Sequence, residues 1–445
     1  MQYKNTIRVS EFEKLYYDDT KPFKQKHWEA LCRYQEQQNN KSEGQVEYYR
    51  ILNKGIQFTN YVGVIQAGNL TIEVLPKTDR RRITAANLSI DNLVKDDPDA
   101  SNSKQNWHNV LLQMLKECRL LKVNHMDYAN LNLKSNSILD IYIELFLSEI
   151  EKLLHEGLVK KYRKIEANKL ALKGQLLFAK NISENIIRQE RFYVRYNEYN
   201  RINIFNQLLY KTLCLIPSIN ANPWLTDKVN LLLLAFPEMT DCKVTSRSFE
   251  KLNYDRKTER YKDALLISKM LLLNYRPDIT GGRENVIAIL FDMNKLWEEF
   301  VYRRLSKSAG PGIEVYRQNK KPFWYSKTYN FHKIVKPDIV IKKNNKSIIL
   351  DTKWKILNDN KPGDEDLKQM FVYNLFWDAE KSFLIYPGIN EANEGSYFHF
   401  ALSDHRRHVN DQVYLNHCSL AFINVLDEKG SLTSNVPFER LINFI

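Results

Sequence analysis

The segment KPDIVIKKNNKSIILDTKWK, from Lys336 to Lys355, is the most informative part of the C-terminal third. Two runs of β-prone residues flank Asn344 and Asn345. Asparagine tolerates the left-handed backbone conformation that a two-residue hairpin turn requires. The stretch therefore predicts a β-hairpin that turns at these two asparagines.

The pairing of this hairpin brings two carboxylates together. If Lys343 pairs with Lys346 across the turn, counting outward along both strands places Asp338 opposite Asp351. Directly opposed residues have Cβ atoms about 4.5 to 5.5 Å apart, which is close enough for two carboxylates to share one divalent ion. The alternative interpretation is that both are ordinary strand-end residues that alternate with valine and isoleucine.

Lys353 adds a positive charge to the same face of the hairpin. Side chains two apart on a strand share a face, so Lys353 projects beside Asp351 while Thr352 points away. Two carboxylates this close repel each other in an apolar run, and a bound cation is the simplest compensation. Mg²⁺ suits such a site because it takes a few carboxylates, keeps several waters and binds phosphate. We expect Lys353 to orient or help deprotonate an attacking water and to stabilise charge on the phosphate.

A helix upstream of the hairpin offers a third carboxylate. The segment DMNKLWEEFVYRRL, from Asp292 to Leu305, has apolar residues at helical spacing. Glu298 lies at the edge of this stripe, and Glu299 lies nearer the opposite side. Glu298 is therefore the better candidate for an inward carboxylate, and a solvated residue at the helix edge is the alternative.

A further helix is predicted downstream of the hairpin. The segment DEDLKQMFVYNLFW can start a helix at Asp364. Gln369 and Tyr373 are four residues apart and share one face of it. These side chains either contact the carboxylate site or only cap the core, and the sequence leaves both readings open.

The residues that precede the hairpin interleave positive charge with aromatic rings. Such a segment suits a strand or loop that lies along DNA, and an exposed basic loop over an aromatic core is the alternative. The basic members are Arg317, Lys320, Lys321, Lys327 and Lys333, and the aromatic members are Phe323, Trp324 and Tyr325.

The composition is that of a folded, basic protein. A chain of 445 residues exceeds one ordinary core, which predicts two or three domains. A formal net charge of +13 and an aromatic content of 12% favour nucleic acid as a partner. Five scattered cysteines without a C-x-x-C pair indicate neither a disulfide framework nor a structural zinc site. The sequence has no apolar run of about 18 residues and no apolar leader, so we expect a cytoplasmic location.

Three regions of different texture predict a multidomain α+β fold. Residues 1–105 hold short β-like runs followed by a polar connection from Thr78, which predicts a β-rich N-terminal domain. Residues 106–280 show helical spacing, clearest between a capping Ser137 and a terminating Gly157, which predicts a mainly helical middle domain. Residues 285–445 mix helices with strands, which predicts a C-terminal α/β domain.

Several motifs occur in an order that a known family shares. They are YVGVIQAGNLTIEVLPK (61–77), LKVNHMDYANL (121–131), the turn at Glu156-Gly157-Leu158, ALKGQLLFAKNI (171–182), FNQLL (205–209), FDMNKLWEEFV (291–301), PDIVI (337–341) and LDTKWK (350–355). In these motifs the chain resembles the McrC component of McrBC-type and LlaJI-type restriction systems. The resemblance covers most of the chain.

The resemblance implies that the C-terminal domain is a restriction-endonuclease-like PD-(D/E)xK domain that cuts DNA. It implies Mg²⁺ as the cofactor, with Mn²⁺ as an alternative ion. Six residues match the signature of that superfamily: the metal ligands Asp338, Asp351 and Glu298, together with Lys353, Gln369 and Tyr373. Tyr373 is also a candidate DNA contact.

The resemblance implies macromolecular partners as well. These are double-stranded DNA and an McrB-like AAA+ GTPase ring, which the N-terminal part of this chain would bind and stimulate. The ring would bind GTP, in keeping with the absence of a G-x-x-x-x-G-K-[ST] loop from this sequence. A dimer through the nuclease domain is a further expectation.

One motif departs from the family pattern. A basic R-G-R or K-G-R is expected where this sequence has Lys173-Gly174-Gln175, so the coupling to the ring differs if the second basic residue matters. An ordinary turn is the alternative interpretation of this motif. Two other functions stay open: an adaptor with a degenerate nuclease fold that activates the GTPase, and a plain DNA-binding module.

Overall fold

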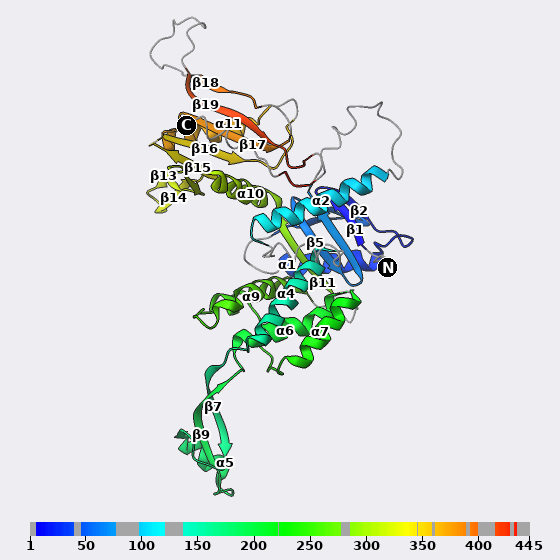
Figure 1. Ribbon diagram of the computed structural model, residues 1–445, viewed down its shortest axis with the longest axis vertical. Helices are drawn as coiled ribbons and strands as arrows, with labels where there is room; N and C mark the ends of the chain where they lie inside the picture. Colours follow the sequence, from blue (N-terminus) through cyan, green and yellow to red (C-terminus); the bar gives the residue numbers. More distant parts are fainter. Residues whose placement is uncertain are drawn as a thin grey trace, which may run out of the picture.

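The computed structural model describes residues 6–39, 46–76, 98–120, 137–220, 222–276, 285–344, 346–357, 361–388, 392–398, 414–427 and 431–433. Figure 1 shows an elongated molecule. A central sheet and a helical body lie between a long projecting arm at one end and an α/β layer at the other. None of the described helices combines the length and the apolar character needed to cross a membrane.

The central sheet joins strands from both halves of the chain. Its order is β1 (Thr6–Ser10), β6 (Leu70–Leu75), β5 (Tyr61–Ala67), β11 (Val286–Asp292) and β10 (Tyr275–Arg276). Strand β1 runs parallel to β6, and the other neighbours are antiparallel. Strand β11 pairs with β5 along its whole length. The sequence pattern changes at residue 285, but the chain does not leave the central sheet there. Strand β11 completes that sheet before the chain enters the α/β layer.

The N-terminal region contains helices that the sequence analysis did not predict. A small sheet of β2 (Lys14–Tyr16), β4 (Gly55–Phe58) and β3 (Tyr49–Leu52) accompanies α1 (Gln25–Asn39). Helix α1 buries residues at helical spacing, such as Ala30, Leu31 and Tyr34, but most of its sequence is polar, so the apolar stripe is weak in the sequence. The polar connection expected as far as residue 105 ends earlier, because α2 (Pro98–Glu117) starts at a proline suited to the first helical turn. Residues 77–97 of that connection lie outside the described residues.

The helical body is built around α4 (Ile138–His155). Ser137 caps this helix as predicted, because its side chain accepts a hydrogen bond from the Asp140 amide at 3.1 Å. Gly157 follows the C-cap with φ +84°, the left-handed conformation that glycine adopts at low cost. The remaining helices are α6 (Ile204–Ile219), α7 (Pro223–Ala235), α8 (Ser246–Glu250), the 3₁₀ turn Glu259–Tyr261 and α9 (Lys262–Asn274).

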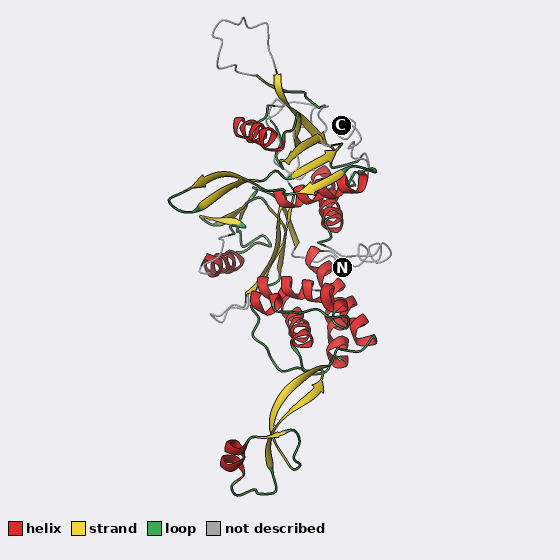
Figure 2. Ribbon diagram, turned by 90° about the vertical axis from the view of Figure 1, so that its left-hand side faces the viewer, coloured by secondary structure: helices red, strands yellow, loops and turns green. Residues whose placement is uncertain are grey.

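The projecting arm is the main departure from a helical middle domain. It consists of β7 (Lys161–Lys169), β8 (Gln175–Leu176), α5 (Phe178–Asn185) and β9 (Phe192–Asn200), and both views show it extending away from the body (Figures 1 and 2). Gly174, in the departing motif, has φ +80°, and a Cβ there would lie 2.5 Å from the Arg195 carbonyl oxygen. This motif is therefore a tight turn against β9 that requires glycine.

The C-terminal layer is a six-stranded mixed sheet with helices on both faces. Its order is β12 (Glu314–Arg317), β15 (Ile339–Lys343), β16 (Lys346–Thr352), β17 (Lys381–Pro387), β19 (Tyr414–Ile423) and β18 (Ser396–Phe398). Ile339 and Leu350 pack in the same core as α10 (Met293–Ser308), whereas Val340 and Ile349 pack with α11 (Asp364–Trp377). A separate hairpin of β13 (Lys321–Ser326) and β14 (Phe331–Val335) lies at the edge of this layer.

Candidate active site

The hairpin has the register that the sequence predicts. Lys343 pairs with Lys346, and Ile339 pairs with Leu350. Asp338 and Asp351 are the residues next to this last pair, one on each side of the hairpin. Asn344 adopts φ +48° at the turn, while Asn345 lies outside the described residues. Local sequence alone thus places the two aspartates at the same end of the hairpin.

Asp338 is held by the opposite strand through a contact that differs from the prediction. Its Oδ2 accepts hydrogen bonds from the amide and the hydroxyl of Thr352, both at 2.8 Å. The prediction that Thr352 points away from the site is therefore wrong. Asp338 precedes the first residue of β15, so regular strand geometry no longer fixes which neighbour its carboxylate meets.

Asp351 carries the most perturbed carboxylate of this cluster. Its residue is 2% exposed, and burial, followed by the nearby charge of Asp338, raises its pKa to about 7. The Lys353 ammonium lies 2.8 Å from Oδ2, yet the contact lacks the geometry of a directed hydrogen bond. A buried, reluctantly charged carboxylate beside another carboxylate is the environment that a cation would stabilise.

Lys353 is the centre of the polar contacts. Besides Asp351, its Nζ lies 3.4 Å from Asp366 Oδ1 and donates to Gln369 Oε1 at 3.1 Å. Burial opposes protonation, but Asp351 and the other carboxylates outweigh it and raise the Lys353 pKa. Lys353 is therefore an ammonium at neutral pH, which favours charge stabilisation and orientation over the deprotonation of water.

Helix α11 supplies the outer part of this network. Gln369 Nε2 donates to the Tyr373 hydroxyl at 2.7 Å, and that hydroxyl donates to the Lys336 carbonyl at 3.1 Å. Gln369 thus contacts Lys353 directly, whereas Tyr373 contacts Gln369 and the backbone of Lys336 before the hairpin. Burial, followed by the charge of Asp351, raises the Tyr373 pKa to about 12, so its hydroxyl keeps its proton.

Asp366 is a site residue that the sequence analysis missed. It lies in the first turn of α11, where its carboxylate accepts from Lys355 Nζ at 2.5 Å and faces Lys353. Burial raises the pKa of Asp366, but Lys355 and Lys353 together lower it by more. The pKa therefore lies below its ordinary value, and Asp366 stays charged. The signal available in the sequence was an acidic first turn, which looks the same in any helix stabilised by its dipole.

Glu298 faces inward from α10, as the apolar stripe predicts. It is 8% exposed, and burial, followed by Asp338, raises its pKa. Its Oε1 accepts from Gln318 Nε2 at 2.7 Å and lies 3.5 Å from Arg317. Glu299, expected on the opposite side, is also largely covered, because it forms ion pairs with Arg303 and Arg317.

The basic and aromatic segment divides into anchored and exposed residues. Arg317 is engaged by the two glutamates, and Lys321 donates to the Phe376 carbonyl at 2.5 Å. The other members are exposed on or beside the β13–β14 hairpin: Lys320, Lys327, Lys333, Phe323, Trp324 and Tyr325. The aromatic rings are themselves exposed, which differs from a basic loop that covers an aromatic core.

The described residues contain no group of three acidic, histidine or cysteine side chains that are already arranged to hold a metal ion. Asp338 and Asp351 nevertheless fit a hard cation that takes two carboxylates and completes its shell with water and phosphate oxygens. Glu298 fits less well, because Gln318 and Arg317 occupy its carboxylate.

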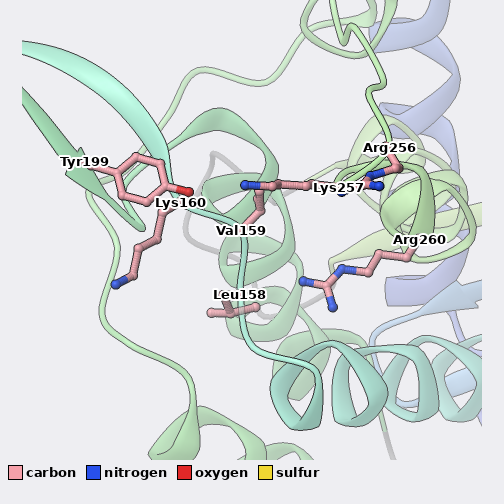
Figure 3. Close-up of a pocket in the computed structure, with 7 residues that line it drawn as sticks. All are labelled: Leu158, Val159, Lys160, Tyr199, Arg256, Lys257 and Arg260. Atoms are coloured by element: carbon pink, nitrogen blue, oxygen red, sulfur yellow. The ribbon is translucent and has the colours of Figure 1, made fainter.

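A pocket of about 290 Å³ lies elsewhere, at the root of the arm (Figure 3). It is lined by Leu158, Val159, Lys160, Tyr199, Arg256, Lys257 and Arg260. This lining contains four basic residues and no acidic one, so it lacks the ligands for a hydrolytic metal centre. The carboxylates that suit such a centre lie at the hairpin and not in this pocket.

Comparison with known proteins yields one consistent family. A model described as McrBC 5-methylcytosine restriction system component matches residues 56–387. The type IV methyl-directed restriction enzyme EcoKMcrBC of Escherichia coli (strain K12) is 23% identical over 288 residues, covering 60% of this chain and 82% of that protein.

The structural comparison extends over nearly the whole chain. A half-complex from a tetradecameric assembly of Thermococcus gammatolerans McrB AAA+ hexamers with bound McrC contains a chain that matches with a TM-score of 0.67. The two are 20% identical, and the match covers 99% of this chain and 100% of that chain. Another structure, of the Thermococcus gammatolerans McrBC complex, matches with a TM-score of 0.48 and 19% identity over 68% of this chain and 88% of that one. The first match shows a shared fold.

Proposed function

The chain belongs to the family of McrBC 5-methylcytosine restriction system components, and we propose that it is the McrC-type subunit that hydrolyses DNA phosphodiester bonds. The observation that carries the proposal is the convergence of Asp338, Asp351 and Lys353 at one end of a hairpin. Asp351 is buried there with a pKa raised to about 7, and perturbed carboxylates of this kind are typical of functional sites.

The proposed cofactor is Mg²⁺, with Mn²⁺ as an alternative. Asp338 and Asp351 would hold the ion, which supplies a polarised water and neutralises phosphate charge when bound. Thr352 keeps Asp338 oriented through two hydrogen bonds. Lys353, kept protonated by its carboxylate neighbours, stabilises the charge that develops on the phosphate, and Gln369 fixes the position of its ammonium.

Glu298 is proposed as a further carboxylate at this centre. It would join only if its contacts with Gln318 and Arg317 were exchanged, since both bind its carboxylate here. Arg317 also pairs with Glu299, so it has an alternative partner when Glu298 moves. We therefore place Glu298 in a supporting role and rank it below Asp338 and Asp351.

The β13–β14 hairpin is the proposed DNA contact beside the centre. The segment from Val315 to Pro337 contains six lysine or arginine residues and no aspartate or glutamate. Trp324 is 55% exposed at this hairpin. A two-stranded ribbon fits the major groove of DNA, and an unbroken positive segment favours a polyanion over a second copy of itself, which would be repelled.

The arm is the proposed contact with a GTPase ring. The Thermococcus structure contains McrB AAA+ hexamers with bound McrC, which motivates a ring as the partner of this chain. The arm exposes several large apolar side chains, and a cluster of this kind is typical of a surface that contacts another protein. These residues are Leu170, Leu172, Phe178, Ile182, Ile186 and Ile187. GTP would bind to the ring, and a dimer through the α/β layer is a further proposal.

The test is cleavage of duplex DNA by the full chain with its GTPase partner, GTP and Mg²⁺. We expect cleavage products that disappear when EDTA replaces Mg²⁺. Stimulated GTP hydrolysis without cleavage under any divalent ion would instead support an adaptor with a degenerate centre. DNA binding with neither activity would reduce the chain to a binding module.

A further inference from the structure

A buried carboxylate next to the central sheet contacts the residue that follows Lys353. Glu11 follows β1, and its amide donates to the Leu75 carbonyl at 3.0 Å, which keeps it in line with the sheet. Its residue is 2% exposed. Its Oε2 accepts a hydrogen bond from Trp354 Nε1 at 2.9 Å, across 343 residues of sequence. Trp354 is the residue after Lys353.

Trp354 also contacts the helix that carries Glu298. Its ring lies 5.2 Å from that of Trp297, centroid to centroid, and Trp297 immediately precedes Glu298. The Trp297 indole N–H points to the Ile385 carbonyl at 3.4 Å, and the Lys353 amide donates to the same carbonyl at 2.9 Å. The two tryptophans and this carbonyl thus connect the D-x-K segment with α10.

The central sheet holds α10 by a second route. Strand β11 runs directly into this helix, and Asp292 at the junction caps it by accepting from the Asn294 amide at 3.0 Å. Asn60, next to β5, donates its side-chain amide to Asp292 at 2.9 Å and accepts from the Met293 amide at 2.9 Å. The sheet therefore fixes α10 through Asn60 and fixes the D-x-K segment through Glu11.

We infer that Glu11 and Trp354 are positioning residues, which set the distance between the Asp351–Lys353 pair and Glu298 from the central sheet. This inference rests on the proposed nuclease function. A carboxylate that is almost fully buried loses its hydration, a cost that an apolar side chain would avoid. A hydrogen bond is directional, so it fixes one orientation of the indole where apolar packing would allow several.

The experiment compares variants that differ by one hydrogen bond. Trp354→Phe keeps an aromatic ring and removes the N–H group. Trp28→Phe is the matched control, because Trp28 Nε1 also donates one 2.9 Å hydrogen bond, to the Gly55 carbonyl in the N-terminal region. At equal melting temperature, we expect Trp354→Phe to slow single-turnover cleavage about tenfold to a hundredfold, the effect of a slightly misplaced catalytic group. Trp28→Phe should cleave at the wild-type rate.

Substitutions of Glu11 separate positioning from packing. Glu11→Gln retains an acceptor oxygen and should cleave within about threefold of wild type, whereas Glu11→Leu should match Trp354→Phe. The double variant Glu11→Leu/Trp354→Phe should be no slower than either single variant, because both remove the same contact. Equal rates for Trp354→Phe and Trp28→Phe, or a Glu11→Gln as slow as Glu11→Leu, would overturn the inference.

A measurement without catalysis keeps the two proposals apart. Mn²⁺ affinity is measured by calorimetry on the full chain, without DNA or ring. We expect it to be weaker in Trp354→Phe and unchanged in Trp28→Phe. If wild type binds Mn²⁺ but never cleaves DNA, the proposed function fails while the positioning inference is still decided by these affinities. Identical Mn²⁺ affinities in the two variants contradict the inference, whatever the cleavage result.

Discussion

Lys353 Nζ lies 2.8 Å from Asp351 Oδ2, and each charge changes the protonation of the other group. The carboxylates hold Lys353 protonated, and Lys353 partly offsets the burial that raises the Asp351 pKa. Buried Asp351 and partly exposed Lys353 therefore form a close ion pair near Asp338. Because this ion pair lies at one end of the hairpin, a carboxylate and an ammonium group are available at one place, which separate surface residues would not provide.

Removing either member of this pair should abolish DNA cleavage. For Asp351→Ala and Lys353→Ala we expect losses of a hundredfold or more, on the order of those seen when a metal ligand or a transition-state charge is deleted. The melting temperature of Asp351→Ala should be held or raised, because one of two repelling carboxylates is gone. Cleavage and the GTPase rate of the ring are measured side by side. Full cleavage by Asp351→Ala would falsify the site assignment, and joint loss of both activities with a lower melting temperature would make these residues structural.

The stability of the metal-free protein should depend on the charge of Asp351. The pKa of Asp351 is about 7 in the folded chain, above the ordinary value of 3.8. Between these two pH values, the folded chain keeps a proton on Asp351 that the unfolded chain has released. The contribution of Asp351 to the free energy of unfolding therefore falls as the pH rises from about 4 to about 7, and stays constant above that.

This dependence is isolated by comparing wild type with Asp351→Asn in EDTA. The variant should melt at a higher temperature than wild type near pH 8, and the difference should shrink near pH 5, where the folded Asp351 is already protonated. A difference that is constant across this range would mean that burial does not perturb this carboxylate.

The parts of the site that the sequence predicts depend on short-range rules. The hairpin register follows from the period of two and from Asn344 at the turn, so the placement of Asp351 needs no long-range information. The inward face of Glu298 follows from helical spacing in the same way. Both outcomes are set by backbone geometry within about 20 residues.

The parts that the sequence did not predict depend on contacts between distant segments. Strand β11 is an apolar run that is covered on both faces of the central sheet. Such a pattern indicates a buried strand but does not reveal that its partner is β5. Asp366 enters the site only because α11 packs beside the D-x-K strand. The Thr352 hydroxyl contacts Asp338 beyond the last residue pair between β15 and β16. Each of these depends on tertiary packing rather than on local propensity.

The arm should bind the GTPase ring through its exposed apolar residues. Ile187, 91% exposed near the end of the arm, is the residue to change. Ile187→Asp in the full chain should weaken ring binding by about tenfold or more, because a charge is costly in an apolar contact. Leu234→Asp on α7, where the side chain is 86% exposed, is the matched control and should bind normally.

Binding is measured by calorimetry or interferometry on intact proteins rather than on a fragment. A fragment that ends at residue 275 would lack β11, so β5 would keep its pairing with β6 but lose its other neighbour in the central sheet. Equal weakening by both variants would move the contact away from the arm. Unchanged binding by Ile187→Asp would remove this part of the arm from the interface.

DNA binding by the isolated chain should be dominated by phosphate contacts. The positive β13–β14 segment motivates this, and the affinity should fall steeply with salt and differ little between sequences. The variant Lys320→Ala/Lys327→Ala/Lys333→Ala should lower the slope of log affinity against log salt by about 2 to 3, since each phosphate contact contributes about 0.9. Replacing Lys14, Lys21 and Lys24 removes the same charge from an exposed part of the N-terminal region and should leave the slope nearly unchanged.

The exposed ring of Trp324 should contribute a component that salt does not remove. Trp324→Ala should weaken DNA binding severalfold, because the DNA would lose its contact with a large exposed ring, and it should leave the salt slope at its wild-type value because no charge is lost. Fluorescence anisotropy with duplexes of several sequences, across a salt series, measures both quantities for each variant. If Trp324→Ala and the triple lysine variant both bind as tightly as wild type at every salt concentration, the hairpin does not contact DNA. If the control lysines lower the slope equally, the attraction comes from the net charge of the whole chain and the hairpin has no special role.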